Sequence, residues 1–117
     1  MLADGSEYTG DYTVQRQRLT EFHMERAYQL VENQVDVVAF ETLPSLAEVE
    51  AVVDVIQGLK PQPAWLSLSC RDAYSLASGE PIREVFDRVR GIANLVAIGV
   101  NCSQPSRTEQ ALSLIHI

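Results

Sequence analysis

Three short apolar runs at regular spacing constrain the fold of this chain more than any other feature. They are residues 35–40 (VDVVAF), 64–68 (AWLSL) and 95–100 (LVAIGV), each of strand length and rich in β-branched or aromatic residues. The first and third are almost continuously apolar, which is typical of strands buried on both faces of a parallel sheet. The sequence therefore predicts three buried strands, with starts about thirty residues apart.

The segments between these runs repeat apolar residues at steps of three and four, the pattern of amphipathic helices. We expect helices over residues 14–33 and 45–60, a third starting at Pro81, and a fourth after Ser106. Ser45 and Glu48 predict a capping box at the start of the second helix, in which each side chain accepts the backbone N–H of the other residue. Pro61 ends that helix, because proline cannot continue one.

Strands that alternate with amphipathic helices predict right-handed crossovers and a parallel α/β sheet. The periodicity fits both a barrel and an open, doubly wound sheet. The chain has no glycine-rich dinucleotide motif after a strand and no Walker-type loop, so a nucleotide-binding fold has no positive support. With 117 residues, the chain is long enough for one small domain with one core.

Charge and cysteine content narrow the function classes. The formal net charge of −7 argues against non-specific binding to nucleic acid or to anionic membranes. No apolar run approaches the roughly 18 residues that cross a bilayer, and the N-terminus lacks the pattern of a secretory signal. Two cysteines, Cys70 and Cys102, make no disulfide framework, so we expect a reducing compartment, the cytoplasm.

Polar and thiol side chains follow the three predicted strands. Glu41 follows the first, Cys70 the second, and Asn101 with Cys102 the third. Because active sites of parallel α/β folds lie at the C-terminal ends of strands, we expect these residues to converge on one edge of the sheet. His23, in a charged helix, is expected at the surface.

These strand-end residues have competing interpretations. Glu41 could pair with a substrate ammonium group, or with a neighbouring arginine in a purely structural role. Cys102 could be a metal ligand, a nucleophile or a small buried side chain, and its position alone favours burial, as it does for Cys70.

Taken in order, four strings resemble the homocysteine S-methyltransferase family. They are LADGSEYTGDY, VDVVAFETLPSLAEVEA, WLSLSCRD…SGEP and VAIGVNC, between Leu2 and about Pro105. The E-T-x-P-S-x-x-E run and G-V-N-C are the most specific parts. The resemblance implies that residues 1–117 are a fragment of a single (β/α)₈ TIM barrel domain. After Pro105 the likeness fades, and residues 111–117 are either a helix start or a non-native tail.

The resemblance also implies a zinc site. In the family, three cysteine thiolates hold zinc, and the G-x-N-C run places one of them on Cys102. The other two form an adjacent Cys-Cys pair that this sequence lacks, so we expect them outside this chain. Glu41 is implied to bind the amino group of homocysteine, and Asn101 to orient the substrate or the metal. Cys70 matches no ligand position, and no catalytic group beyond the metal site is implied.

The implied reaction moves a methyl group from a sulfonium donor, S-methylmethionine or S-adenosylmethionine, to the thiol of homocysteine, which gives methionine. Binding to zinc would keep that thiol deprotonated. Two alternatives stay open: a catalytically inert βα fragment, and a piece of another α/β-barrel enzyme such as a lyase with Glu41 as base. The only lysine, Lys60, ends a helix and gives no support to a Schiff-base aldolase.

Overall fold

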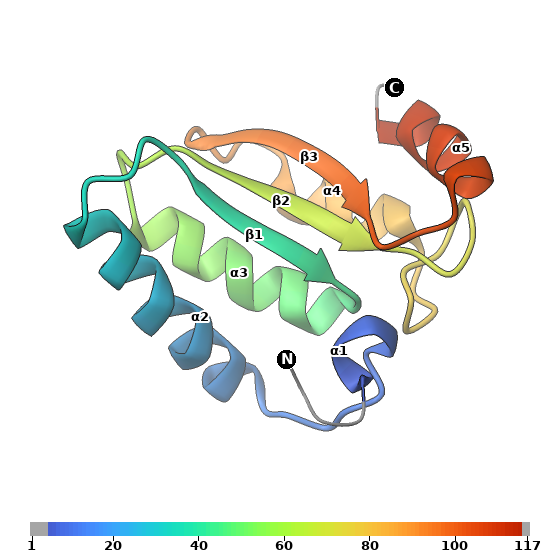
Figure 1. Cartoon of the computed structure of the whole chain (residues 1–117), viewed down its shortest axis with the longest axis horizontal. Coiled ribbons are helices and arrows are strands. Elements are labelled where there is room, and N and C mark those ends of the chain that lie inside the picture. Colours follow the sequence, from blue (N-terminus) through green and yellow to red (C-terminus); the bar gives the residue numbers. More distant parts are fainter. Residues whose placement is uncertain (1–4, 116–117) are drawn as a thin grey trace.

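The computed structural model describes residues 5–115; residues 116 and 117 of the 111–117 segment lie outside this range. Strands and helices alternate along the chain as predicted (Figure 1). The elements are α1 (Ser6–Thr9), α2 (Arg16–Glu32), β1 (Val38–Leu43), α3 (Leu46–Gly58), β2 (Ala64–Ser69), α4 (Ile82–Val89), β3 (Leu95–Asn101) and α5 (Pro105–Ile115). The short α1 was not predicted. Residues 111–115 continue α5, and Ala111 is buried in the core.

The strands form one parallel sheet in the order β1-β2-β3. Phe40 pairs with Leu66, and Leu66 pairs with Ile98. All three arrowheads in Figure 1 point the same way, so the strand ends meet along one edge. Sequential strand order, with the helices packed into one core on one side of the sheet, is the arrangement of a barrel segment and also of one half of a doubly wound sheet.

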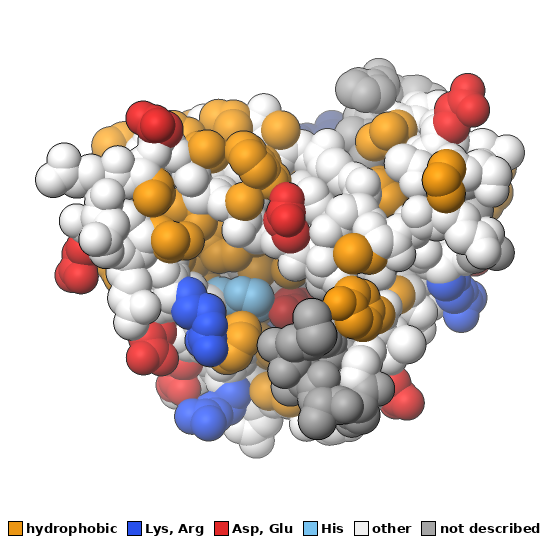
Figure 2. Space-filling view, viewed as in Figure 1, with side chains coloured by type: hydrophobic (Ala, Val, Ile, Leu, Met, Phe, Trp, Pro, Cys, Tyr) orange, Lys and Arg blue, Asp and Glu red, His pale blue; other side chains and the backbone are white. Residues whose placement is uncertain are grey.

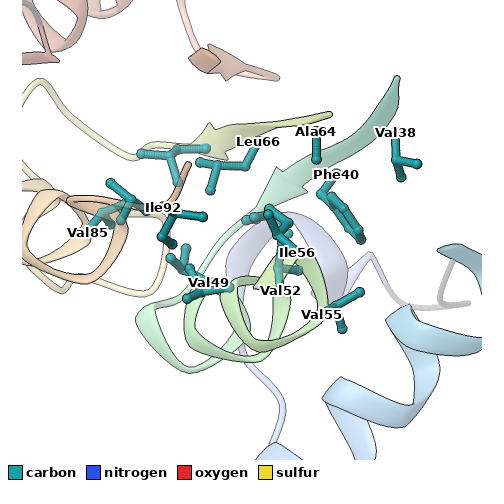
Figure 3. Close-up of a cluster of buried hydrophobic side chains, with 14 of the residues drawn as sticks. Val38, Phe40, Val49, Val52, Val55, Ile56, Ala64, Leu66, Val85 and Ile92 are labelled. Carbon is teal, nitrogen blue, oxygen red and sulfur yellow. The ribbon is translucent and has the colours of Figure 1, made fainter. Parts of the chain in front are cut away.

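The core lies between the strands and the helices α3 and α4. Side chains of α3 point toward those of β1 and β2 (Figure 3). Val52, Ile56 and Leu66 have no exposed surface, and Val85 of α4 extends the same cluster toward β3. Fully burying one such aliphatic side chain contributes roughly 1.5–3 kcal/mol. The apolar stripe read from the sequence is therefore the face that fixes α3 on the sheet.

Helix bounds differ from the predictions at several points: α2 begins at Arg16, α3 ends at Gly58, before Pro61, and α4 begins at Ile82 with Pro81 as its N-cap. At α3, the Ser45 hydroxyl accepts the Glu48 N–H at 3.3 Å, but the Glu48 carboxylate turns away to Tyr12 and His23. Only half of the predicted capping box therefore forms. The last helix begins at Pro105 and not after Ser106, since a proline fits the first helical position, where its missing N–H costs nothing.

Short connections of equal length lead into the strands. Residues 33–37, 59–63 and 90–94 each form a five-residue link from a helix to the next strand. Asn94 connects the links 59–63 and 90–94, because its side-chain amide donates to the Gln62 carbonyl at 2.9 Å. The same amide donates to the Ile56 carbonyl of α3 at 2.7 Å. None of the helices within residues 5–115 is both long and apolar enough to cross a membrane.

Candidate functional site

A bulge shapes the C-terminal end of β1. Phe40 pairs with Leu66 and Leu43 with Leu68, so three steps on β1 match two on β2. Phe40 and Leu43 are both buried as a result, while Glu41 is exposed. Thr42 takes up the extra residue with a φ of 64°. Such a conformation is unusual for a β-branched residue and costs on the order of 1–3 kcal/mol.

The ends of β1 and β3 are joined by side chains. The Thr42 N–H donates to Asn101 Oδ1 at 3.2 Å, and Asn101 Nδ2 donates to Thr42 Oγ1 at 2.8 Å. Thr42 Oγ1 also lies 3.7 Å from the Sγ of Cys102. The chain thus brings Glu41, Thr42, Asn101 and Cys102 to one edge of the sheet, where convergence was expected. Thr42 was missed by the sequence analysis, although it follows Glu41 directly.

The two cysteines differ in their environments. Cys102 is exposed, so the expectation of burial drawn from its position alone is wrong for this residue. A φ of 48° turns it away from the line of β3 and out of the core. Cys70 is buried as expected, and burial, followed by the charge of Asp72, raises the pKa of its thiol to about 11. A thiol held protonated in this way is a poor metal ligand.

Ser103 ties the ends of β2 and β3 together. Its hydroxyl accepts the Cys70 N–H at 3.0 Å and lies 3.2 Å from the Cys70 carbonyl and 3.0 Å from that of Asn101. The backbone on either side of Cys102 is therefore anchored to the middle strand. This anchoring holds the exposed thiol at a defined position on the edge.

The opening segment 5–12 passes over the same edge, beside the arrowhead of β1 (Figure 1). The Ser69 hydroxyl donates to the Tyr8 carbonyl at 3.2 Å. Gly10 has a φ of 71°, and a Cβ there would meet the side chain of Ser78 at 3.1 Å. The segment is thus fixed at the strand ends before the chain enters α2.

A cluster of three polar side chains, which we call the Tyr12–Glu48–His23 cluster, lies between the opening segment, α2 and α3. The Tyr12 hydroxyl donates to Glu48 Oε2, and His23 Nε2 lies 2.9 Å from Glu48 Oε1. The His23 side chain is only 14% exposed, so the surface position expected for it is wrong. Burial, and then the charge of Arg26, lowers the pKa of His23 to about 4, while burial raises the pKa of Glu48 to about 7.

A hollow of about 800 Å³ lies along the outer side of β1, between this strand and α2. Glu41, His23 and Phe22 are among its lining residues, and Figure 2 looks into it, where histidine, basic and acidic side chains gather beside hydrophobic ones. A second hollow of about 480 Å³ follows the outer side of β3. Both outer strands therefore present an open edge and uncovered apolar surface, which in parallel sheets is normally paired or covered.

Cys102 is a side chain at this edge that could bind a metal. Within residues 5–115, no group of three His, Cys, Asp or Glu side chains could hold a metal ion. Cys102 itself suits zinc, because it offers an exposed, soft sulfur whose neighbour is a neutral hydroxyl. The residues present thus fit one ligand of a site whose other donors come from elsewhere.

Comparisons with known proteins give consistent matches. The family model described as homocysteine S-methyltransferase matches residues 1–117. A homocysteine S-methyltransferase of Escherichia coli K12 is 37% identical over 115 residues, which is 98% of this chain and 37% of the relative. A selenocysteine Se-methyltransferase of Brassica oleracea is 36% identical over 107 residues, which is 89% of this chain and 31% of the relative.

A solved structure agrees. The crystal structure of the metallated form of the E. coli homocysteine methyltransferase MmuM matches with a TM-score of 0.90 at 37% sequence identity, over 97% of this chain and 40% of that one. The chain therefore spans about a third of the length of the curated relatives it matches.

Proposed function

Because the chain belongs to the homocysteine S-methyltransferase family, we propose that the longer protein carrying it methylates the thiol of homocysteine. The donor is a small sulfonium compound, S-methylmethionine or S-adenosylmethionine, and the product is methionine. The observation that carries this proposal is that Glu41 and Cys102 lie at the same edge of the sheet. Thr42, the neighbour of Glu41 in the chain, contacts the Cys102 sulfur. An amino-acid thiol needs both a charge partner for its ammonium group and a site that activates its sulfur.

Cys102 provides one thiolate ligand of a zinc site, and the other two thiolates come from outside residues 1–117. When bound, zinc lowers the pKa of a coordinated substrate thiol, so that a thiolate is available at neutral pH. Three protein thiolates leave the fourth tetrahedral position open for the substrate. The relative crystallised in a metallated form supports a metal in this family. Cys70 takes no part, since its thiol is buried and stays protonated.

Glu41 binds the substrate ammonium group. Its side chain is exposed at the bulge, on the same edge as Cys102. Asn101 orients the substrate or the metal ligand beside it. One N–H of the Asn101 side chain donates to Thr42 Oγ1, and the Asn101 Oδ1 accepts the Thr42 N–H. The second N–H of the Asn101 side chain is left to orient the substrate or the metal ligand.

We further propose that residues 1–117 are part of a single barrel domain and act in the cytoplasm. The open edges of β1 and β3 and the hollows beside them support a sheet that continues on both sides. A thiol that binds zinc must stay reduced, which favours a reducing compartment. A Schiff-base aldolase finds no support within this segment, since Lys60 lies in the link at the start of β2, at the opposite end of the sheet.

Two pairs of variants of the longer protein test the proposal. Cys102→Ala should lose zinc and activity together, because two thiolates hold the metal much more weakly than three. Cys70→Ala, a matched control one strand away, should keep zinc. Metal analysis showing full zinc in the Cys102 variant would overturn the ligand assignment.

Glu41→Gln should keep zinc and raise the KM for homocysteine at least tenfold, because a charge-assisted bond becomes a neutral one. Glu32→Gln, an exposed carboxylate at the end of α2, is the control and should leave KM unchanged. An unchanged homocysteine affinity in Glu41→Gln would remove the ammonium assignment.

A further inference from the structure

We propose that Thr42 is a positioning residue for this site: its hydroxyl holds the amide of Asn101 and directs its proton to the sulfur of Cys102. The inference rests on the proposed function, because it takes Cys102 as the metal ligand. It assigns a specific task to a residue at the end of β1 whose side chain reaches the end of β3.

The first support is the backbone. Among residues 5–115, the non-glycine residues with positive φ are Gln34, Thr42 and Cys102. Gln34 lies in the link into β1, at the far end of the sheet. The other two face each other across the strand ends, with their side chains in contact. Strained residues of this kind cluster at functional sites, where the surrounding structure holds them in place.

The second support is the hydrogen bonding of Thr42. Its N–H and its Oγ1 lone pair both go to the amide of Asn101, at 3.2 and 2.8 Å. The hydroxyl proton is then left for the Cys102 sulfur, which lies 3.7 Å from Oγ1. A thiolate accepts hydrogen bonds and cannot donate one, so in the metal-binding form Thr42 is the donor.

The third support is the choice of residue. A bulge that needs positive φ alone is best served by glycine, which has no steric penalty there. Threonine is among the least suited residues, because its branched Cβ crowds the backbone. Its presence is explained if the hydroxyl is required at this position.

Removing the hydroxyl should therefore act on the metal. Outer-shell hydrogen bonds to metal ligands are typically worth about 10–100-fold in metal affinity. In the longer protein, Thr42→Val keeps the branched shape but loses the hydroxyl, and we expect at least a tenfold loss of zinc affinity in competition with a chelator. Thr42→Ser keeps the hydroxyl and should remain within about threefold of the parent protein.

A spectroscopic measurement separates positioning from general stability. With Co²⁺ in place of zinc, the sulfur-to-cobalt absorption band should shift in Thr42→Val and stay in place in Thr42→Ser. Thr20→Val is the matched control, because among the described residues the Thr20 hydroxyl bonds to the Arg16 carbonyl of its own helix, far from this site in the chain. Thr20→Val should leave both the zinc affinity and the band unchanged.

Thr42→Gly distinguishes the hydroxyl from the backbone, and it also carries the test if the valine variant does not fold. Glycine accepts the positive φ but has no hydroxyl, so it should lose zinc affinity as valine does. Parental zinc affinity and an unshifted cobalt band in either variant would overturn the inference. If Cys102→Ala also kept its zinc, the proposed function itself would fail; if that variant lost zinc while Thr42→Gly kept it, only the role of Thr42 would fail.

Discussion

Replacing Glu48 by glutamine separates the hydrogen bonds of the Tyr12–Glu48–His23 cluster from its ionisation. Glutamine has nearly the same shape, can accept the Tyr12 hydroxyl through its carbonyl and can donate to a neutral His23 through its amide. What it removes is the buried acid. We expect Glu48→Gln to stabilise the protein at pH 8, and the gain should disappear on acidification.

The sign and size follow from the two pKa values. Burial raises the pKa of Glu48 from its ordinary 4.5 to about 7, so the stability that this group contributes is complete below pH 4.5 and is lost as the pH rises through 7. A difference of this size corresponds to about 3 kcal/mol. The Glu48 side chain is 13% exposed, and water screens part of the effect, so we expect about 1–3 kcal/mol at pH 8.

His23 acts in the opposite direction. Its pKa falls from 6.5 to about 4, chiefly through burial and then through the charge of Arg26, so its contribution is complete above pH 6.5 and is lost as the pH falls toward 4. Between pH 4.5 and 6.5 the contributions of Glu48 and His23 to the free energy of unfolding of the parent protein change with pH in opposite directions. In Glu48→Gln only the His23 contribution remains, so the free energy of unfolding of this variant should rise with pH over this range.

The assay is urea unfolding of the longer protein at a series of pH values between 4.5 and 8, with the variant compared to the parent. Glu50→Gln is the control from the same helix, because the Glu50 carboxylate pairs with Arg16 and Arg88. Glu50→Gln should leave the free energy of unfolding at pH 8 unchanged or lower it, and it should show no stabilisation that increases with pH. A Glu48→Gln difference that is constant with pH, or negative at pH 8, would refute the reasoning.

Three further predictions concern the scaffold. Ser45→Ala should lower the free energy of unfolding by about 1 kcal/mol in urea titrations, since it removes the cap of α3, and Ser45→Asp should restore most of this loss. Asn94→Ala should cost about 1–3 kcal/mol in the same assay, because the Gln62 carbonyl loses its side-chain donor, while the Ile56 carbonyl is left with the Leu59 N–H. Residues 1–117 expressed alone should keep no zinc through gel filtration and should not methylate homocysteine, because Cys102 is the single thiolate proposed here and both sheet edges are open; a monomer with a cooperative transition and measurable turnover would contradict this.

The order of elements could be predicted because apolar periodicity reports burial directly. The stripe of α3 faces the core, as predicted. Burial on both faces was predicted for the first and third strands and is wrong: β1 alternates between buried and exposed residues, β3 has no buried residue, and the middle strand β2 is the buried one. The start of α3 was predicted correctly, because a local hydrogen bond of the Ser45 cap decides it. The sheet direction followed from the alternation of strands and helices, and the choice between a barrel and an open sheet needed the match to the solved structure of a relative.

The details of the site could not be predicted, because they depend on contacts between distant segments. The bulge at Thr42 shifts the side-chain alternation of β1 by one residue, and no pattern in the neighbouring sequence predicts this shift. His23 lies in a charged helix, but Tyr12 and Glu48, from other segments, bury it. The exposure of Cys102 likewise depends on a backbone turn at the end of β3.

The equal five-residue links at the strand starts have a consequence for protein engineering. Each strand with the helix after it advances the sheet by one position, so each such unit can be exchanged as a module. Suitable crossover points for chimeras with the relatives lie within residues 33–37, 59–63 and 90–94, at the end of the sheet away from Thr42 and Cys102. Gly91 has a φ of 78°, so a crossover within residues 90–94 should keep this glycine, although an added Cβ would meet no atom within 4 Å. Recombination there would exchange whole strands and still leave the reacting edge assembled from complete strand ends.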